Sequence, residues 1–429
     1  MAQKVAIVGY GVEGQSSYRY WSELGADVTV HDENTSLELP KGIKSVLGTK
    51  YLESLDRYDL VVRSPGVRPW LIKTSAPVTT SLNEFMARCP ARIIGVTGTK
   101  GKGTTATLIA RILGEAGWRT HLGGNIGVPP LDFLSKVRAS HLVVLELSSF
   151  QLMDLEQSPH IAVALPIEPE HLDWHRSMHE YVAAKGNIFW HQEADDVAVY
   201  NAHNHYSAEI ANVSAGHKLP YLERPGAVIA NDRVVMGGVE ICRVDEVAMI
   251  GPHNLENACA AVTATWELVK QNPEAPARAL KGFTGLPHRL EFVREVAQVR
   301  YVNDSFSSNP IATEAAINSF AEPKILILGG KDRGIDFGQL AARVAEDNVK
   351  QVVLVGENTQ LLAAAFNGIG YRHYTLGGMT MTAIVAQAQR LASPGDVVVL
   401  SPGSASFDMF TNFSDRGEQF KAAVKALSP

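Results

Sequence analysis

The sequence predicts an α/β protein of three domains, each built on a largely parallel sheet. Short apolar runs recur along the chain, and stretches with helical spacing separate them, as in sheets that are buried on both faces. Two of these runs lead directly into glycine-rich turns, within residues 5–14 and 91–105. The 429 residues are also too many for one ordinary core, because domains usually hold roughly 100–200 residues.

Composition and charge narrow the class of protein. The formal net charge is −6 and the basic residues are scattered, which argues against a nucleic-acid partner or an acidic membrane surface. The three cysteines, Cys89, Cys242 and Cys259, have no disulfide or zinc spacing and favour a reducing compartment. Glycine interrupts the first apolar run too early for a signal peptide, and no segment reaches the roughly 20 apolar residues of a membrane span. We therefore expect a soluble cytoplasmic protein without nucleic acid or membrane insertion. We also expect a monomer, although none of these observations bears on the oligomeric state.

The first domain is predicted over residues 1–90. A strand runs into Gly9-x-Gly11-x-x-Gly14, a helical stretch follows, and a second strand ends at Asp32. This is the pattern of a Rossmann-like βαβ unit, in which an acidic residue at the second strand binds a ribose. The pattern alone leaves three interpretations open: NAD, a nucleotide sugar, or a tight turn without a ligand. A further strand ends in the turn Ser64-Pro-Gly66.

The second domain, over residues 91–285, contains the motif Gly95-Val-Thr-Gly-Thr-Lys-Gly-Lys-Gly-Thr-Thr105. An apolar run precedes it and a helical pattern follows, so the backbone N–H groups of the turn and of the helix start converge on an anion. Lys102 adds a positive charge, which favours a nucleotide phosphate tail over a purely structural turn. The strict Walker pattern of phosphate loops, Gly-x-x-x-x-Gly-Lys-Ser/Thr, is not met. Val96 stands in place of its first glycine, and Gly103 stands in place of its Ser or Thr. We expect a domain that is similar to the P-loop ATPases.

Polar residues follow two later apolar runs of the second domain. Glu146 ends one run, and His171 lies in a loop after the next. Because ligands of open parallel sheets gather at the carboxyl ends of strands, both side chains are expected beside the phosphate loop. A nucleotide triphosphate needs a divalent cation, usually held by one or two protein oxygens besides its phosphates. Glu146 and His171 are therefore candidate metal ligands, whereas Lys185 on its helix would ordinarily be a solvated cation.

The third domain is predicted over residues 286–429. Its apolar runs alternate with helical stretches rich in Ala and Leu, which indicates a second Rossmann-like, doubly wound domain. Two short polar clusters lie near its start, His288-Arg289 and Asn303-Asp-Ser305. Each cluster alone is more typical of an exposed surface than of a binding site.

Six motifs follow one another along the chain. They are Thr97-Gly-Thr-Lys-Gly-Lys102, Leu145-Glu-Leu-Ser-Ser-Phe-Gln151, Glu170-His-Leu-Asp173, Gly251-Pro-His-Asn-x-x-Asn257, Gly285-Leu-Pro-His-Arg289 and Asn303-Asp-Ser305. In this order they resemble the motifs of the Mur ligases, which are ATP-dependent amide-bond-forming enzymes of peptidoglycan precursor synthesis. The resemblance covers the whole chain. The C-terminal stretch Ser401-Pro-Gly-Ser-Ala-Ser-Phe-Asp, with Phe413 and Arg416, resembles the members that add D-glutamate.

The resemblance implies a reaction with two substrates besides ATP. ATP would phosphorylate the carboxylate of UDP-N-acetylmuramoyl-L-alanine, and the amine of D-glutamate would attack the acyl phosphate. The first domain is then implied to bind UDP rather than NAD, and the central domain to bind ATP and magnesium. Closure of the third domain would shield the acyl phosphate from water. Lys185 matches a lysine that is carbamylated in the family, and a carbamate would turn this cation into an anionic oxygen ligand.

The implied site residues fall into four groups. The catalytic residues are Lys102, His171 and Lys185. The nucleotide-binding residues are Gly98, Thr99, Lys100, Gly101, Lys102, Gly103, Thr104, Asn257, Arg289 and Asp304. The metal ligands are Glu146, His171, Lys185 and Thr104. The substrate-contacting residues are Gly11, Asp32, Ser64, Gly66, Asn125, Ser148, Gln151, Ser308, Arg333, Ser406, Phe407 and Phe413.

Departures from the family pattern bear on this site. Gly103 lacks the hydroxyl expected on magnesium, and Thr104 is one residue late, about 100° away on a helix. Phe306 stands where many members carry lysine, Arg333 replaces a common lysine, and the segment Pro166-Ile-Glu-Pro-Glu before His171 is unusual. Two other interpretations stay open. One is a different amino-acid ligase of the superfamily, such as a folylpolyglutamate synthetase, and the other is a non-catalytic UDP-sugar-binding protein.

Overall fold

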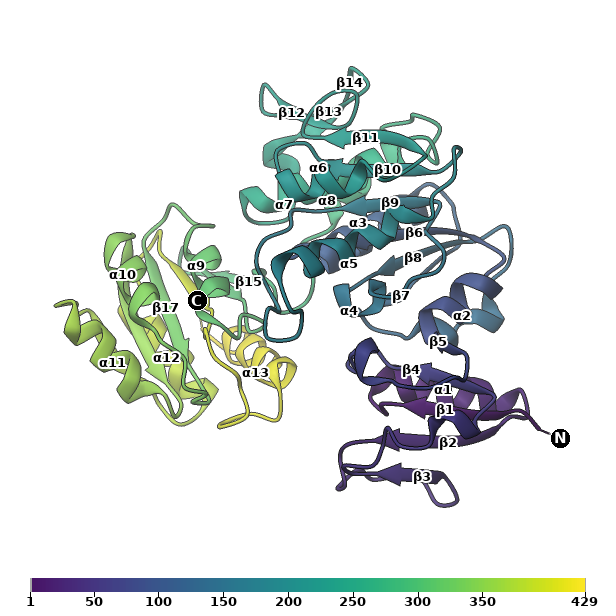
Figure 1. Ribbon diagram of the computed structural model, residues 1–429. Helices are drawn as coiled ribbons and strands as arrows, with labels where there is room; N and C mark the ends of the chain where they lie inside the picture. The colour runs from purple at the N-terminus through teal and green to yellow at the C-terminus, as the bar shows by residue number, and fades with distance from the viewer. Residues whose placement is uncertain (1, 429) are drawn as a thin grey trace. The chain divides into compact units, whose positions relative to one another are not determined.

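The computed structural model describes residues 2–428. Three largely parallel sheets alternate with α-helices along the chain, and a small antiparallel sheet is added to them (Figure 1). The predicted α/β class is confirmed. Two compact units form: the first holds residues up to 247 together with 255–282, and the second holds residues 248–254 and those from 283 onward. The domain boundaries expected near residues 90 and 285 stay predictions.

The first sheet has the strand order β3-β2-β1-β4-β5, and all its pairs are parallel. Its glycine turn has a steric basis: a Cβ on Gly14 would lie 2.0 Å from the carbonyl oxygen of Gly9, so the helix start packs directly on the strand end. The elements are β1 (Lys4–Val8), α1 (Val12–Glu23), β2 (Asp27–Asp32), β3 (Lys44–Leu47), β4 (Leu60–Arg63), β5 (Val78–Thr80) and α2 (Ser81–Arg88).

The second sheet has the order β11-β10-β9-β6-β8-β7 and is parallel throughout. Strand β8 is buried at every residue, as its continuous apolar run predicts. The elements are β6 (Arg92–Thr97), α3 (Lys102–Glu115), β7 (Thr120–Gly124), β8 (Leu142–Glu146), α4 (Ser149–Leu152), β9 (Ile161–Ala164), α5 (Met178–Trp190), β10 (Val197–Asn201), α6 (His205–Ala211), β11 (His217–Tyr221), α7 (Pro252–Thr265) and α8 (Glu274–Gly282).

The antiparallel sheet was not expected from the sequence. It comprises β12 (Val228–Ala230), β13 (Arg233–Met236) and β14 (Val239–Arg243). Its two tight turns place Asn231-Asp232 and Gly237-Gly238 at positive φ. These residue pairs are the ordinary signal of two-residue hairpin turns, because Asn, Asp and Gly tolerate that conformation.

The third sheet has the order β15-β16-β20-β17-β18-β19 and is parallel except for β15, which pairs antiparallel with β16. The expected Rossmann-like class therefore holds for most of this sheet. The elements are β15 (Glu291–Val296), β16 (Val299–Asn303), α9 (Pro310–Ile317), β17 (Lys324–Gly329), α10 (Gly338–Glu346), β18 (Val349–Val355), α11 (Thr359–Gly368), β19 (Tyr374–Leu376), α12 (Met381–Leu391), β20 (Val397–Leu400) and α13 (Phe413–Lys425).

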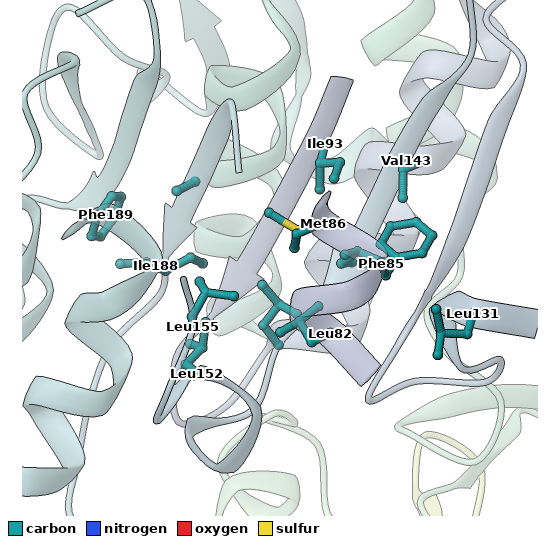
Figure 2. Close-up of a cluster of buried hydrophobic side chains, with 14 of the residues drawn as sticks. Leu82, Phe85, Met86, Ile93, Leu131, Val143, Leu152, Leu155, Ile188 and Phe189 are labelled. Carbon is teal, nitrogen blue, oxygen red and sulfur yellow. The ribbon is translucent and has the colours of Figure 1, made fainter. Parts of the chain in front are cut away.

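One cluster of buried apolar side chains joins the first and second sheets. Leu82, Phe85 and Met86 of α2 pack in the same cluster as Ile93 of β6 and Val143 of β8 (Figure 2). Each fully buried side chain of this size contributes roughly 1.5–3 kcal/mol. This shared core explains why the first two sheets form one compact unit. No helix within residues 2–428 combines the length and the apolar character that crossing a bilayer requires.

Candidate active site

The glycine-rich turn between β6 and α3 is shaped by close packing. Gly98 and Gly101 have φ of +145° and +83°. A Cβ on Gly98 would lie 2.6 Å from the Cβ of Leu165, and one on Gly101 would lie 2.4 Å from Oδ1 of Asn257. Glycine is thus required at both positions, and Asn257 packs directly on the turn. Gly101 caps α3 without a side-chain hydrogen bond, so the first N–H groups of the helix suit an anion.

Two lysines converge on one carbonyl oxygen of this turn. Nζ of Lys102 donates to the oxygens of Gly98 at 3.0 Å and Thr99 at 2.7 Å. Nζ of Lys185, from α5, donates to the same oxygen of Gly98 at 2.8 Å. The adjoining Lys100 is exposed. The structure therefore brings Lys102 and Lys185 together at the phosphate loop, as their predicted roles require.

Lys185 is 1% exposed, so the expectation of a solvated cation at this position is wrong. Burial, and after it the charge of Lys102, lower the pKa of Lys185 well below its ordinary value. The carboxylates of Glu170 and Glu146 act in the opposite direction. The side chain is thus a buried amine with a reduced tendency to hold a proton.

Glu146 lies at the same sheet edge as the phosphate loop, because it pairs with Val96 of β6 in the parallel register. Its side chain is buried, and Oε1 accepts a hydrogen bond from Nδ2 of Asn125 at 2.8 Å. Thr104, in the first turn of α3, is buried as well. Carboxylate and hydroxyl oxygens are the ligands that magnesium prefers, so these residues fit the ion.

Within residues 2–428, no group of three His, Cys, Asp or Glu side chains is arranged to hold a metal. The expected set of Glu146, His171, Lys185 and Thr104 contains only two such residues. A magnesium site here would depend on nucleotide phosphates and on a modified Lys185, and it stays a prediction.

His171 lies in the loop between β9 and α5 in a left-handed conformation, with φ of +56°. For a residue other than glycine this costs on the order of 1 kcal/mol and is common in functional loops. Its Nε2 is 3.7 Å from the carboxylate of Glu170, and its ring centroid is 4.9 Å from that of Phe150. The half-exposed ring remains accessible to a ligand.

Ser148 and Gln151 form a capping box at the start of α4, and this local role occupies their polar atoms. Gln151 also donates to Glu13 of α1, which accepts a second hydrogen bond from Ser81. Burial raises the pKa of Glu13 above its ordinary value. Gln151 thus links α4 to the helix α1 of the first sheet, whereas contacts of Ser148 and Gln151 with substrate stay predictions.

A cavity of about 610 Å³ lies over the glycine turn of the first sheet. It brings together all four residues predicted there: Gly11, Asp32, Ser64 and Gly66. Asp32 accepts hydrogen bonds from the backbone N–H groups of Tyr10 and Asn34, and Ser64 donates to the oxygen of Gly9 at 2.6 Å. Sequence reasoning missed other lining residues, namely Glu33, Tyr51, Arg68, Leu71 and Trp174.

Arg63 holds the turn beside this cavity. Its side chain is fully buried and makes two hydrogen bonds with the carboxylate of Asp154, at 2.8 and 2.5 Å. It also donates to the carbonyl oxygens of Ser64, Pro65 and Val67. A guanidinium suits this place because it offers five N–H donors in a fixed plane.

The polar cluster Asn303-Asp-Ser305 at the end of β16 is buried, so the expectation that it lies on an exposed surface is wrong. Asp304 accepts hydrogen bonds from Ser307, Ser401 and the backbone of Leu290. Burial nevertheless raises the pKa of Asp304 to about 6. The neighbouring Ser305 is bonded by the buried guanidinium of Arg416, a residue of the C-terminal motif.

Two cation–aromatic contacts involve arginines predicted for the site in the second unit. The guanidinium carbon of Arg289 lies 3.8 Å from the ring centroid of Phe306, which makes an edge contact with Phe413. The guanidinium carbon of Arg333 lies 5.6 Å from the ring centroid of the exposed Phe407. The flanking Ser406 is buried, and Ser308 is exposed before α9. Their ligand contacts stay predictions.

Three family models match the chain in order. They are described as the Mur ligase MurD-like N-terminal domain over residues 3–76, the Mur ligase middle domain over 96–265, and the Mur ligase glutamate ligase domain over 288–403. Curated relatives named UDP-N-acetylmuramoylalanine–D-glutamate ligase align over nearly the full length. One, from Clostridium botulinum strain Loch Maree, is 38% identical over 99% of this chain and 97% of its own. Another, from Clostridium novyi, is 37% identical with the same coverage.

Solved structures share the fold at low identity. The UDP-N-acetylmuramate–alanine ligase MurC of Thermotoga maritima has a TM-score of 0.60 at 16% identity, over 99% of both chains. The MurF ligase of the same organism, determined in complex with ADP, has a TM-score of 0.60 at 15% identity, over 99% of this chain and 96% of its own. Identities this low show the fold alone. The three family models and the full-length curated relatives together show that the chain belongs to the Mur ligase family.

Proposed function

We propose that this chain adds D-glutamate to UDP-N-acetylmuramoyl-L-alanine, in an ATP-dependent reaction of peptidoglycan precursor synthesis in the cytoplasm. The observation that carries the proposal is the phosphate loop, where Lys102 and the buried Lys185 meet at the oxygen of Gly98. Glu146 at the same sheet edge offers a carboxylate oxygen to the magnesium ion that accompanies a nucleotide phosphate tail. The D-glutamate-adding names of the full-length relatives support the choice of amino acid.

The phosphate loop binds ATP in this proposal. The N–H groups at the start of α3 hold the phosphates, and Lys102 leaves its carbonyl partners to neutralise the charge that moves with the γ-phosphoryl group. Asn257, which packs on Gly101, contacts the nucleotide, whereas nucleotide binding by Arg289 and Asp304 of the second unit stays a prediction. The carboxylate of the UDP sugar attacks the γ-phosphorus, and ADP leaves with the electron pair of the broken bond.

Glu146, Thr104, His171 and a modified Lys185 would hold magnesium in the proposed site. The neutral form of a lysine amine adds to carbon dioxide, and the lowered pKa of Lys185 makes this form more abundant. The addition gives a carbamate and releases a proton. That modification makes Lys185 an anionic oxygen donor beside Glu146. When bound, magnesium supplies positive charge to the phosphoryl group during transfer.

The second unit binds the amino acid. D-Glutamate carries two carboxylates, and the guanidinium of Arg333 offers a charge-assisted contact with one of them. Ser308, Ser406, Phe407 and Phe413 complete the amino-acid site. The free amine attacks the acyl carbon, and the tetrahedral intermediate expels phosphate as the amide forms.

Phosphate release tests the proposal. The purified protein is mixed with ATP, magnesium and UDP-N-acetylmuramoyl-L-alanine, and D-glutamate is compared with L-glutamate, meso-diaminopimelate and L-alanine. We expect release that needs all substrates and is much faster with D-glutamate. Faster release with another amino acid would overturn the assigned substrate. Tight UDP-sugar binding without any turnover would favour a non-catalytic binding protein, for which Gly103 and Phe306 are the sequence arguments.

A further inference from the structure

The cavity of the first sheet has an unusual charge distribution. Three carboxylate residues line it, Glu13, Asp32 and Glu33, and its lining contains one cationic side chain, that of Arg68. The diphosphate of a UDP sugar is an anion. A ligand of this kind can occupy the cavity only if positive charge offsets the carboxylates.

The start of α1 supplies part of this positive charge. The helix begins after Gly11 without a side-chain cap, and Gly9, Gly11 and Gly14 all line the cavity. A helix N-terminus is equivalent to roughly half an elementary charge. Glu13 in the first turn opposes it with a carboxylate that is tied to Ser81 and Gln151. The backbone alone is therefore a poor anion site, and the cation of Arg68 becomes important.

The loop between β9 and α5 holds Arg68 at the cavity. Its Nη2 donates to the carbonyl oxygen of Asp173 at 2.7 Å. The next residue, Trp174, lines the cavity and donates its indole N–H to the oxygen of Gly66 at 3.3 Å. The Trp174 ring also packs on Trp70, at 5.6 Å between centroids. The bond to Asp173 uses one of five guanidinium donors, and a bidentate phosphate contact needs only two.

We propose that Arg68 binds the diphosphate of the UDP sugar and that Trp174 is a positioning residue, which closes the cavity and keeps the Arg68 segment in place. This inference rests on the proposed function, because it takes the UDP sugar as the ligand of the cavity. It assigns a role to a contact between the first sheet's Ser64–Leu71 segment and the loop that carries His171.

Replacement of Arg68 by Met tests the diphosphate contact, because Met keeps much of the aliphatic stem and removes the charge. We expect KM for UDP-N-acetylmuramoyl-L-alanine to rise on the order of 10- to 100-fold, as for loss of a charge-assisted hydrogen bond, with little change in kcat. Calorimetry should show the same loss of affinity for UDP and much less for uridine, which lacks phosphates. Equal losses for UDP and uridine, or no loss for UDP, would overturn the proposal.

Arg176→Met is the matched control. Arg176 belongs to the same surface, 4.4 Å from the Trp70 ring, but it pairs with Glu180 and does not line the cavity. We expect its UDP affinity and KM to match the wild-type protein. A loss as large as that of Arg68→Met would mean that the aromatic packing, and not the Arg68 charge, supports binding.

Trp174→Leu tests the positioning role. It should weaken UDP binding in the wild-type background and have a smaller effect in the Arg68→Met background, since the two residues act on one contact. Additive losses would contradict the positioning role. The binding measurements use UDP and uridine alone, so they test this inference even if the protein shows no ligase turnover with D-glutamate. Absence of turnover would count against the proposed function only.

Discussion

Two glycine-rich turns in this chain have similar backbones and opposite charges. Both follow a parallel strand, both begin with a glycine at positive φ, namely Gly9 and Gly98, and both start a helix whose glycine cap, Gly11 or Gly101, makes no side-chain hydrogen bond. Either turn alone could be taken for a nucleotide-phosphate site. The backbone geometry is therefore insufficient to separate their ligands.

The side chains around the two turns differ. Lys102 and Lys185 meet at the β6–α3 turn, whereas Glu13 and Asp32 lie at the β1–α1 turn. The first arrangement suits a highly charged triphosphate. The second suits a ligand with hydroxyl donors and fewer charges, provided that a cation comes from elsewhere in the fold, and Arg68 lies in that place. Charges brought in by other elements thus decide what each turn can bind.

The largest expected effect comes from removing the cation of the β6–α3 turn. Lys102→Ala should lower kcat by more than about 100-fold, because it removes positive charge from the phosphoryl group in transfer. UDP affinity, measured by calorimetry, should stay unchanged, since UDP is assigned to the other turn. Lys136→Ala is the control, because this exposed lysine of the second domain belongs to none of the predicted sites. Equal loss of UDP affinity and turnover in Lys102→Ala would contradict the separation of the two sites.

Lys185→Ala should also leave little activity, for a different reason. If a carbamate on Lys185 is a metal ligand, the alanine variant lacks an anionic oxygen, and acetate should restore part of the turnover by entering the vacated space. The rescue is measured as phosphate release against acetate concentration, with chloride at equal ionic strength as the control. Thermal denaturation shows whether the loss of a buried side chain has unfolded the protein. A fully active Lys185→Ala enzyme would mean that the charge of this buried residue is irrelevant to the reaction.

Glu13→Gln should change the β1–α1 turn modestly and in the favourable direction. Removal of a carboxylate from the first turn of α1 should tighten UDP binding about two- to fivefold, the range expected for one charge at a helix N-terminus. Calorimetry with UDP and uridine measures it, and the gain should be larger for UDP. Weaker UDP binding in the variant would show that the hydrogen bonds of Glu13 to Ser81 and Gln151 matter more than its charge.

The same variant gives a pH test. Burial raises the pKa of Glu13 in the folded state, so the folded protein binds this proton more tightly than the unfolded chain does. This bound proton contributes fully to the free energy of unfolding below the ordinary carboxyl pKa of 4.5. The contribution is lost as pH rises through the pKa that Glu13 has in the folded protein. Urea denaturation should therefore show the free energy of unfolding of wild type falling relative to Glu13→Gln as pH increases from about 4 to neutrality. A constant difference over that range would contradict the raised pKa.

Sequence reasoning succeeded where parallel strands bring residues together. The family resemblance assigned Gly11, Asp32, Ser64 and Gly66 to one ligand, and they do line one cavity, because the carboxyl ends of parallel strands meet at one edge. It failed where burial depends on packing between elements. A lysine on a helix looks like a solvated cation, yet Lys185 is enclosed against the phosphate loop.

Contacts between sheets gave no usable signal in the sequence. Arg63 with Asp154, and Arg68 with the loop of Trp174, connect residues that lie far apart in the chain. No spacing or periodicity identifies such pairs. The β12–β14 sheet is different, because Asn231-Asp232 and Gly237-Gly238 are local hairpin signals that the sequence does contain. That omission was a failure of interpretation and not of information.

The smallest effect is expected for the residue in which the β6–α3 turn departs from the common phosphate-loop pattern. Gly103 lies inside α3 and is absent from the positive-φ residues, so a serine can adopt its backbone conformation without the strain that Gly98 or Gly101 would impose. We expect Gly103→Ser to retain activity and to reach half-maximal activity at an equal or lower magnesium concentration, because its hydroxyl could add an oxygen near the ion. A magnesium titration of phosphate release measures this effect.

Gly103 is also buried, so packing of the added hydroxymethyl group has to be separated from its effect on the metal. Gly103→Ala is the matched control, since it adds a Cβ without an oxygen. If crowding matters, both variants should lose stability, each by on the order of 1 kcal/mol, and thermal denaturation would report the loss. If the hydroxyl reaches magnesium, only the serine variant should show tighter dependence on the ion. In the wild-type protein we expect a water or Thr104 to occupy the position of the missing hydroxyl. Unchanged melting of Gly103→Ser, with activity that needs a much higher magnesium concentration, would contradict this expectation.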